Sequence, residues 1–375
     1  MLPECLEMVL SQSYENKEVI VVWAGEAVPS EVGDAPGVSV VKLGRSASPA
    51  KRVNAGLRAA TGALHIVLMP HCVPESRRWI QQMAEAFQDD SVDAVVSQCA
   101  VAGGGKRTLG ARLLHSVASP RLLNKRGKVR DLQLVGGQAD AFRAGTLARA
   151  GLLRDAAFPE PGEAVDLSVR LQSSGSRIVL SPSARVIYHD PPHTRSLGAV
   201  LRGGMEHGLA DALLARMHGV DWLGSRLYAA ALLSLALVPL GFLSLPLALL
   251  AALALFVWGL FLPLRIPPLH WEWPAAAANA AVFVAFVLTA RDGWLPGLFE
   301  PRISHPAIVR QWLFLAAMTC SYALIALMAG LESAVRDAVR MRGRLSPPAL
   351  LVLGAAWWLL SGVGFLKGYL WTRAP

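Results

Sequence analysis

The side chains best placed to do chemistry follow one apolar stretch of the chain. Leu64–Met69 (LHIVLM) has the composition of a buried strand, and Pro70, His71 and Cys72 come directly after it. In an open α/β sheet, ligands bind at the carboxyl ends of the strands. The sequence therefore predicts a ligand site in the loop at His71.

A pair of carboxylates forms a second candidate. Glu163 and Asp166 are three residues apart in a segment whose apolar positions recur with helical spacing, so they lie on neighbouring helical faces. Either carboxylate could accept a proton from a substrate hydroxyl. In the alternative interpretation, Glu163 stabilises the start of the helix and Asp166 is solvated.

Basic and thiol side chains offer weaker candidates. Arg52 and Asn54 lie in a polar turn ahead of a short helix, where they could grip a phosphate or order the loop. The alternative is that they belong to an ordinary surface turn. His71 and Cys72, with His65 nearby, could ligate a soft metal ion, but a fourth ligand is lacking. We interpret these three as ordinary loop and core residues.

All charged residues between positions 106 and 130 are basic, behind a run of three glycines. Such a run is usually a solvated loop. The alternative is a basic flap that meets lipid headgroups or a pyrophosphate.

Alternating strands and helices must position these residues. β-branched runs at 19–22, 38–41, 64–69 and 94–96 read as strands, and the segments between them have helical spacing or turn residues. This alternation predicts an α/β fold with a mainly parallel sheet and flanking helices.

The composition adds a membrane part to this fold. The chain has 375 residues, of which 53% are hydrophobic and 17% charged, too apolar for an ordinary soluble protein. We predict an α/β domain at 1–193, an amphipathic interfacial helix and linker at 194–226, and an all-α transmembrane domain at 227–375. Within residues 194–217 we place Asp211 away from the apolar positions. About five spans are predicted, at 227–245, 246–264, 275–290, 311–331 and 348–366.

Charge and cysteine usage indicate the compartment. Arginines lie before the first span and between the fourth and fifth spans. By the positive-inside rule they predict a multi-pass protein of a bacterial-type inner membrane, with its N-terminal domain in the cytoplasm. The formal net charge of +9 favours membrane lipid and anionic substrates as partners, with no nucleic acid. The four cysteines are scattered, which argues against a disulfide framework and a zinc site.

Several motifs occur in an order that resembles the family-2 type of inverting glycosyltransferases, which have a GT-A fold. The resemblance covers roughly residues 2–220. It is carried by four segments: LPECLEMVLSQSYENKEVIVV, KRVNAGLRAATGALHIVLMPHCVPE, VGGQADAFRAG and PGEAVDLSVRLQSSGSRIVLSPSARVIYH.

The resemblance implies a nucleotide-sugar donor, a lipid-linked or cell-envelope acceptor, and Mg²⁺ or Mn²⁺. It places donor or phosphate binding at Arg52, Asn54 and His71, and the acceptor side at Gly137 and Gln138. In such enzymes an Asp-x-Asp motif ends the strand and holds the metal, and the Asp of a Glu-Asp pair is the base.

This sequence departs from that pattern in three places. The metal loop, residues 69–73, has no carboxylate, and the base position is Ala164, which follows Glu163. The first, nucleotide-binding strand of the family is expected to be missing before Leu2. Two hypotheses remain: a membrane glycosyltransferase that uses Glu163 or Asp166 as its base, and an inactive pseudo-glycosyltransferase that is a scaffold or accessory subunit of a membrane complex.

Overall fold

The computed structural model divides the chain into two units, each of which is described by itself. Unit 1 comprises Met1–Ala111 and Ala118–Ser196, and unit 2 comprises Arg112–Val117 and Leu197–Ala374. The structure describes residues 2–102, 108–117, 130–132, 135, 137–154, 158, 162–190, 196–219, 225–237, 239–240, 247–248, 250–252, 254–255, 309, 312–317, 319–320, 327, 330–331, 333–335, 338 and 348–371.

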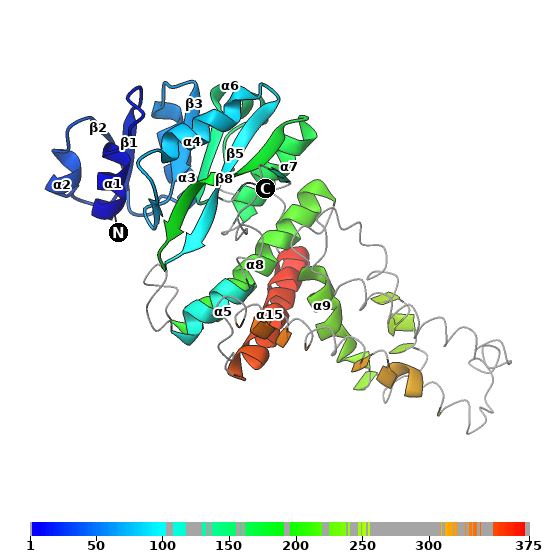
Figure 1. Ribbon diagram of the computed structural model, residues 1–375. Helices are drawn as coiled ribbons and strands as arrows, with labels where there is room; N and C mark the ends of the chain where they lie inside the picture. Colours follow the sequence, from blue (N-terminus) through cyan, green and yellow to red (C-terminus); the bar gives the residue numbers. More distant parts are fainter. Residues whose placement is uncertain are drawn as a thin grey trace. The chain divides into compact units, whose positions relative to one another are not determined.

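Unit 1 is an α/β domain (Figure 1). Its elements, in chain order, are α1 (Leu2–Leu10), β1 (Val19–Ala24), α2 (Ser30–Gly33), β2 (Val38–Leu43), α3 (Pro49–Ala59), β3 (Leu64–Leu68), β4 (Cys72–Pro74), α4 (Trp79–Glu85), η1 (Ala86–Gln88), β5 (Val92–Val101), β6 (Arg130–Leu132), β7 (Ala139–Arg143), α6 (Ala144–Ala150), α7 (Gly162–Ser173) and β8 (Arg177–Tyr188). Between β5 and β6, α5 (Leu109–Val117) contributes residues to both units.

The sheet is mixed, so the prediction of a mainly parallel sheet is wrong. β1 and β2 form a parallel pair, and the larger sheet has the order β3-β7-β5-β8-β4 with β6 beside β8. Among its described strands, the one parallel pair is β5 with β8, whereas β7 runs antiparallel to both β3 and β5. The alternation of helices and strands in the sequence predicts which elements form, but it does not predict whether each strand runs parallel or antiparallel to its neighbours.

The two faces of the larger sheet bury separate sets of side chains. Val95 and Val179 contact the α4 residues Trp79 and Met83 on one face. On the other face Ala94, Val96, Ile178 and Leu180 pack against α3, α6 and α7. This division follows from the alternation of side chains along a strand. The indole Nε1 of Trp79 donates to Ser97 Oγ at 3.0 Å, so the buried ring keeps its polar atom satisfied.

Helix α3 begins earlier than the sequence suggested. Ser48 accepts a hydrogen bond from the backbone N–H of Lys51, and Pro49 occupies the first helical position. Ser followed by Pro is a favourable helix start. The residues predicted as a polar turn, Arg52 and Asn54 among them, therefore lie on the helix itself.

The turn before β3 is tied to the start of β1. The backbone N–H and the hydroxyl of Thr61 donate to Glu18 Oε1 at 2.6 and 2.9 Å, and the N–H of Gly62 donates at 2.9 Å. These donors, with the Thr61 backbone first, hold the pKa of Glu18 below its usual value. The contact fixes where β3 begins, and hence where its carboxyl end lies.

Unit 2 is helical in its described part. Its long helices are α8 (Leu197–His218), α9 (Ser225–Ser234) and α15 (Ala349–Trp371), which lie against one another (Figure 1). A helix, α8, lies where one was predicted after residue 194, and its interfacial placement stays a prediction. Most of the second predicted span, about half of the fourth and all of the third lie outside the described residues.

One helix in the described part of the chain, α15, is long and apolar enough to cross a membrane by its length and composition. It coincides with the fifth predicted span. The other predicted spans remain predictions.

The placing of Asp211 on a polar face is wrong. Its side chain is fully buried, and Oδ2 accepts a hydrogen bond from the backbone N–H of Ser225 at 2.8 Å. Ser225 is the first residue of α9, where N–H groups lack partners within the helix. Asp211 therefore caps a neighbouring helix, which helical periodicity along α8 alone could not show.

Glycines let α8 and α15 approach closely. A Cβ on Gly208 would collide with the Ser361 carbonyl oxygen, and one on Gly364 with the Met205 carbonyl oxygen. A side chain at either position would push the backbones apart.

We expect Gly208→Ala to destabilise the helical unit by at least about 2 kcal/mol, because the backbone of α15 must move. Gly203→Ala is the matched control on the same helix, since a Cβ there meets nothing within 4 Å. That control should be neutral or stabilising, as alanine restricts the unfolded chain. Thermal unfolding followed by circular dichroism measures both. Equal melting temperatures for the two variants would contradict this packing.

Candidate functional site

The carboxyl end of β3 meets the amino end of β7. Beyond the β3–β7 ladder, the Met69 N–H donates to the Gln138 carbonyl oxygen at 2.8 Å. His71 Nε2 and Gln138 Oε1 are 2.6 Å apart. Because an amide oxygen only accepts, the imidazole Nε2 is the donor. The structure thus joins a predicted donor-side residue, His71, to a predicted acceptor-side residue, Gln138.

Further contacts hold His71 in place. Its carbonyl oxygen accepts from the His189 N–H at 2.8 Å, and its ring meets Tyr188 edge-on, with centroids 5.0 Å apart. The ring orientation is therefore set by β8 and by Gln138 together. An imidazole held in this way is pre-organised, but its Nε2 hydrogen is already in use.

Cys72 is buried beside this pair. Its thiol lies 3.8 Å from Gln138 Oε1, and its carbonyl oxygen accepts from the Cys5 thiol at 3.4 Å. Hydrogen bonding with Cys99, then burial, raise the pKa of the Cys72 thiol well above its usual value. Since metals bind the thiolate, this environment disfavours Cys72 as a ligand.

The soft-metal alternative gains nothing from His65. It pairs with Phe142 toward the beginning of β3, away from His71. Among the residues that the structure describes, no three His, Cys, Asp or Glu side chains come together in a way that could hold a metal ion. Mg²⁺ and Mn²⁺ need hard oxygen ligands, so the residues of the 69–73 loop do not fit the ion that the resemblance implies.

Asp140 is a site residue that the sequence reading missed. It is 2% exposed in the middle of the sheet, where it pairs with Val67 and Val96. Its Oδ2 accepts the N–H of Gly137 at 2.5 Å, and Gly137 has a φ of +70°. An acidic residue inside a strand pattern, three positions after glycine, is the signal that could have revealed this turn.

The start of α7 packs against the same turn. A Cβ on Gly137 would lie 3.2 Å from the Cβ of Ala164. Ser168 strengthens the junction, since its hydroxyl donates to the Ala164 carbonyl oxygen and accepts from the Val135 N–H at 2.9 Å. The acceptor-side turn and the expected base position are thus adjacent, and that position carries a methyl group.

The two carboxylates on α7 have different environments. Glu163 is 8% exposed in the first helical turn, beside Ala164. Asp166 is fully buried, which contradicts its interpretation as a solvated residue. Its Oδ2 lies 2.9 Å from Arg170 Nε, and its Oδ1 lies 3.2 Å from Arg154 Nη1.

The Asp166 pairs belong to a structural network. Arg170 also donates to the carbonyl oxygens of Ala150, Gly151 and Leu152, so it fastens α7 to the segment after α6. A carboxylate between two guanidinium groups favours its charged form and is a poor proton acceptor. These contacts argue against Asp166 as the displaced base.

Asn54 and Arg52 are also engaged with backbone. Asn54 is 1% exposed, and its amide donates to the Leu153 carbonyl oxygen at 2.7 Å and accepts from the Leu153 N–H at 3.0 Å. Arg52 is exposed, and its Nε donates to the Ala47 carbonyl oxygen at 2.9 Å. Asn54 thus orders the segment at Leu153. Phosphate binding stays a prediction for Arg52.

The basic run at 106–130 lies mostly outside the described residues, so the choice between a solvated loop and a flap stays open.

With this geometry established, sequence comparison identifies the domain. Residues 1–149 match the family described as Glycosyl transferase family 2. The N-terminal part of the chain is of the family-2 glycosyltransferase type. Its α/β fold is accordingly GT-A-like, as the resemblance implied. A search of curated proteins found no match to this chain.

Three solved structures show a distant similarity. GalNAc-T7 with UDP, GalNAc and Mn²⁺ is 15% identical over 52% of this chain, with a TM-score of 0.40, and this chain spans only 43% of its length. The mannosyltransferase PcManGT from Pyrobaculum calidifontis, in complex with GDP-Man and Mn²⁺, is 17% identical over 86% of this chain and 83% of its own, with a TM-score of 0.43. A mycobacterial protein is 19% identical over 57% of this chain and 70% of its own, with a TM-score of 0.40. The family assignment rests on the sequence match.

The glycosyltransferase domain should lose stability when Asp166 is neutralised. Asp166→Asn leaves two arginines facing a neutral amide, and we expect a cost of about 3 kcal/mol. The control is Asp90→Asn, whose partner Arg143 lies 3.7 Å away at the surface and which should change little. Urea unfolding measures both. A normally stable Asp166→Asn protein would overturn the structural role.

Proposed function

We propose that this protein is a membrane-anchored glycosyltransferase-type protein that no longer performs metal-assisted inverting transfer. In this proposal it is an accessory or scaffold subunit of a membrane complex, with its N-terminal domain in the cytoplasm of a bacterial-type cell. The observation that carries the proposal is the methyl group of Ala164 beside the Gly137 turn, where a Cβ on Gly137 would lie 3.2 Å from it. A methyl group occupies the place from which a base would reach an acceptor hydroxyl.

Charge around the site supports the same conclusion. Transfer from a nucleotide sugar leaves a diphosphate, whose developing charge must be stabilised. The 69–73 loop has no carboxylate to hold a cation, and the His71 Nε2 hydrogen is directed to Gln138. Asp166, one of the two acidic residues on α7, is held by Arg154 and Arg170. Without a base or charge stabilisation, most of the rate enhancement is lost.

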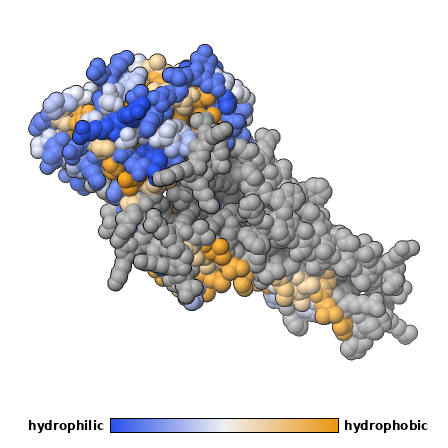
Figure 2. All heavy atoms as spheres, in the orientation of Figure 1, coloured by the Kyte–Doolittle hydropathy of each residue, from blue (hydrophilic) through white to orange (hydrophobic). Residues whose placement is uncertain are grey.

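The surface of unit 2 supports the membrane anchor. Among the described residues, every large hydrophobic side chain recorded as exposed lies between Leu233 and Trp371. Trp371 is 76% exposed and Val352 64%. Figure 2 shows orange patches over the described parts of this unit and a mostly hydrophilic surface over the glycosyltransferase domain. Apolar surface of this extent favours contact with lipid.

A second candidate function is active transfer of a sugar from a nucleotide donor to a lipid-linked or cell-envelope acceptor. Glu163 favours it, because this carboxylate is mostly buried and adjacent to the expected base position. The helix N-terminus stabilises its ionised form. In this alternative Glu163 accepts the acceptor proton.

Comparing the affinity for nucleotides with and without a metal ion distinguishes a cation-dependent donor site from the proposed site, which holds no cation. The purified full chain is titrated calorimetrically with UDP, GDP and their sugar esters, in Mn²⁺ and in EDTA. We expect any dissociation constants in the two buffers to agree within about twofold, because one carboxylate-held ion would contribute far more. Micromolar binding that requires Mn²⁺ would contradict the proposal.

Restoring the base alone should not restore transfer. We expect Ala164→Asp to release no nucleoside diphosphate from UDP- or GDP-sugars above the wild-type level, because the 69–73 loop still lacks metal ligands. Ala164→Asn has the same shape without the charge, and it controls for crowding against Gly137. Measurable transfer by Ala164→Asp only would show that the loop was never needed.

A further inference from the structure

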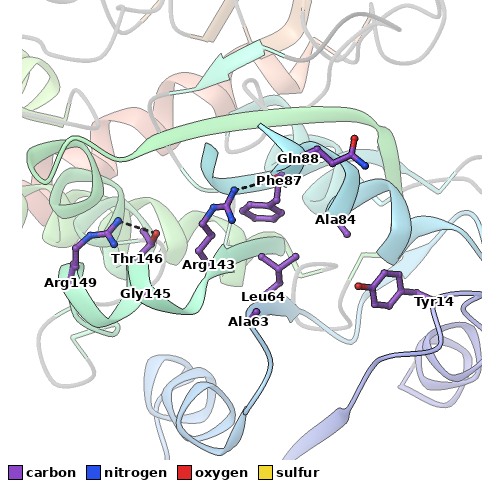
Figure 3. Close-up of a pocket in the computed structure, with 10 residues that line it drawn as sticks. All are labelled: Tyr14, Ala63, Leu64, Ala84, Phe87, Gln88, Arg143, Gly145, Thr146 and Arg149. Carbon is purple, nitrogen blue, oxygen red and sulfur yellow. Dashed lines mark hydrogen bonds between the residues drawn. The ribbon is translucent and has the colours of Figure 1, made fainter. Parts of the chain in front are cut away.

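A cavity of about 460 Å³ lies in the glycosyltransferase domain, away from the candidate site. Its walls come from the start of β3, the end of α4 with η1, the end of β7, helix α6 and Tyr14 (Figure 3). β3 and β7 pair from Leu64↔Arg143 to Leu68↔Ala139. Arg143 and Leu64 line the cavity at one end of this ladder, and His71 and Gln138 follow its other end, roughly four residues or 13 Å along the strands.

The cavity has one apolar and one cationic wall. Leu64, Ala84 and Phe87 supply the apolar side, and Arg143 and Arg149 supply the charge. No acidic residue is among the described residues that line it. Figure 3 shows the Arg143 guanidinium extending to the Phe87 ring, with the two arginines on neighbouring parts of the wall.

Arg143 is fixed in position. Its Nε donates to the Val92 carbonyl oxygen at 2.8 Å and its Nη2 to the Phe87 carbonyl oxygen at 2.7 Å, and its Cζ lies 5.3 Å from the Phe87 ring centroid. Asp90, the nearest acidic partner, is fully solvated. In the part of the chain that the structure describes, Nη1 has no hydrogen-bond partner. It remains available to a ligand in an orientation that is already set.

Asp93 and Thr146 hold Arg149 in a similar way. Its Nη2 donates to Asp93 Oδ1 at 3.0 Å and to the Thr146 hydroxyl at 3.3 Å. The Thr146 hydroxyl donates to the same Asp93 oxygen at 2.7 Å. Nε and Nη1 of Arg149 have no partner within the described residues, and the side chain is 60% exposed. Both arginines thus present unused N–H donors beside the cavity.

We propose that this cavity is a second binding site, for a small organic anion that joins a carboxylate or phosphate group to a flat apolar body. The anion accepts from Arg143 Nη1 and Arg149, and the apolar body lies against Leu64, Ala84 and Phe87. A volume of this size is within the usual range for small-molecule sites. Fixed guanidinium donors are the groups that recognise carboxylate and phosphate oxygens best.

The test titrates the full chain with phenyl phosphate, followed by ligand-observed NMR. Benzoate, inorganic phosphate and phenol are titrated in parallel. Phenyl phosphate or benzoate should bind saturably, and whichever binds more tightly identifies the anionic group. Inorganic phosphate and phenol should each bind at least about tenfold more weakly, since each lacks one half of the recognised chemistry.

Variants locate the binding. Arg149→Gln should weaken phenyl phosphate or benzoate binding about tenfold or more, because a charge-assisted hydrogen bond is lost. Ala84→Phe should abolish binding by filling the apolar side while leaving both arginines in place. Arg78→Gln removes an exposed arginine outside the cavity and should have no effect. His71→Ala should also leave binding unchanged, which separates this cavity from the candidate glycosyltransferase site.

Two results would overturn the proposal. One is the lack of saturable binding by both aromatic anions. The other is binding that Arg149→Gln and a correctly folded Ala84→Phe leave unchanged, or that His71→Ala removes.

Discussion

The antiparallel pairing of β7 with β3 is the constraint on which the candidate site depends. It places Gln138 opposite the end of β3, where Met69 and His71 bond to its backbone and side chain. The same pairing sets the turn at Gly137, which Asp140 closes from within the sheet. α7 then packs on that turn through Ala164. One strand direction therefore brings together three segments that are far apart in the sequence.

The polar side chains of the candidate site form hydrogen bonds and ion pairs within the protein. His71 bonds to Gln138, Asn54 to the Leu153 backbone, and Asp166 to Arg154 and Arg170. Each bond stabilises the fold, and each occupies a group that could otherwise meet a substrate. Glu163 is the carboxylate that stands beside the expected base position, so the choice between the two candidate functions depends on it. A mostly buried carboxylate can serve as a base only if an acceptor hydroxyl reaches it.

Local patterns predicted much of the fold. The strand at Leu64, the helix that carries Glu163, and the long helices α8 and α15 are all present, because each has a strong period or a long apolar run. The direction of β7 was not predictable, since it depends on a pairing between distant strands. Asp166 and Asp211 were misjudged for a related reason. Periodicity places a residue on a face, but a buried carboxylate is explained by its partners, here arginines and a helix start contributed by other segments.

The sequence predicted the location of the candidate site better than it predicted the functions of the individual residues. The end of β3 and the Gly137 turn do meet, as the motif order implied, yet Asp140 was overlooked and Asn54 has a loop-ordering contact. The absence of a carboxylate in the 69–73 loop and the alanine at 164 were visible in the sequence alone. What the structure adds is that Ala164 lies beside the acceptor-side turn, since a Cβ on Gly137 would be 3.2 Å from the Ala164 methyl group.

The most direct measurement is a single-turnover assay. The full chain, in excess over the donor, is mixed with radiolabelled sugar nucleotides and with a membrane extract as the source of acceptor. The proposal predicts no transfer of label by the wild-type protein, and the same background for Glu163→Gln and for the exposed control Glu85→Gln. Label transferred by wild type and by Glu85→Gln, and lost in Glu163→Gln, would contradict it and establish Glu163 as the base of an active glycosyltransferase.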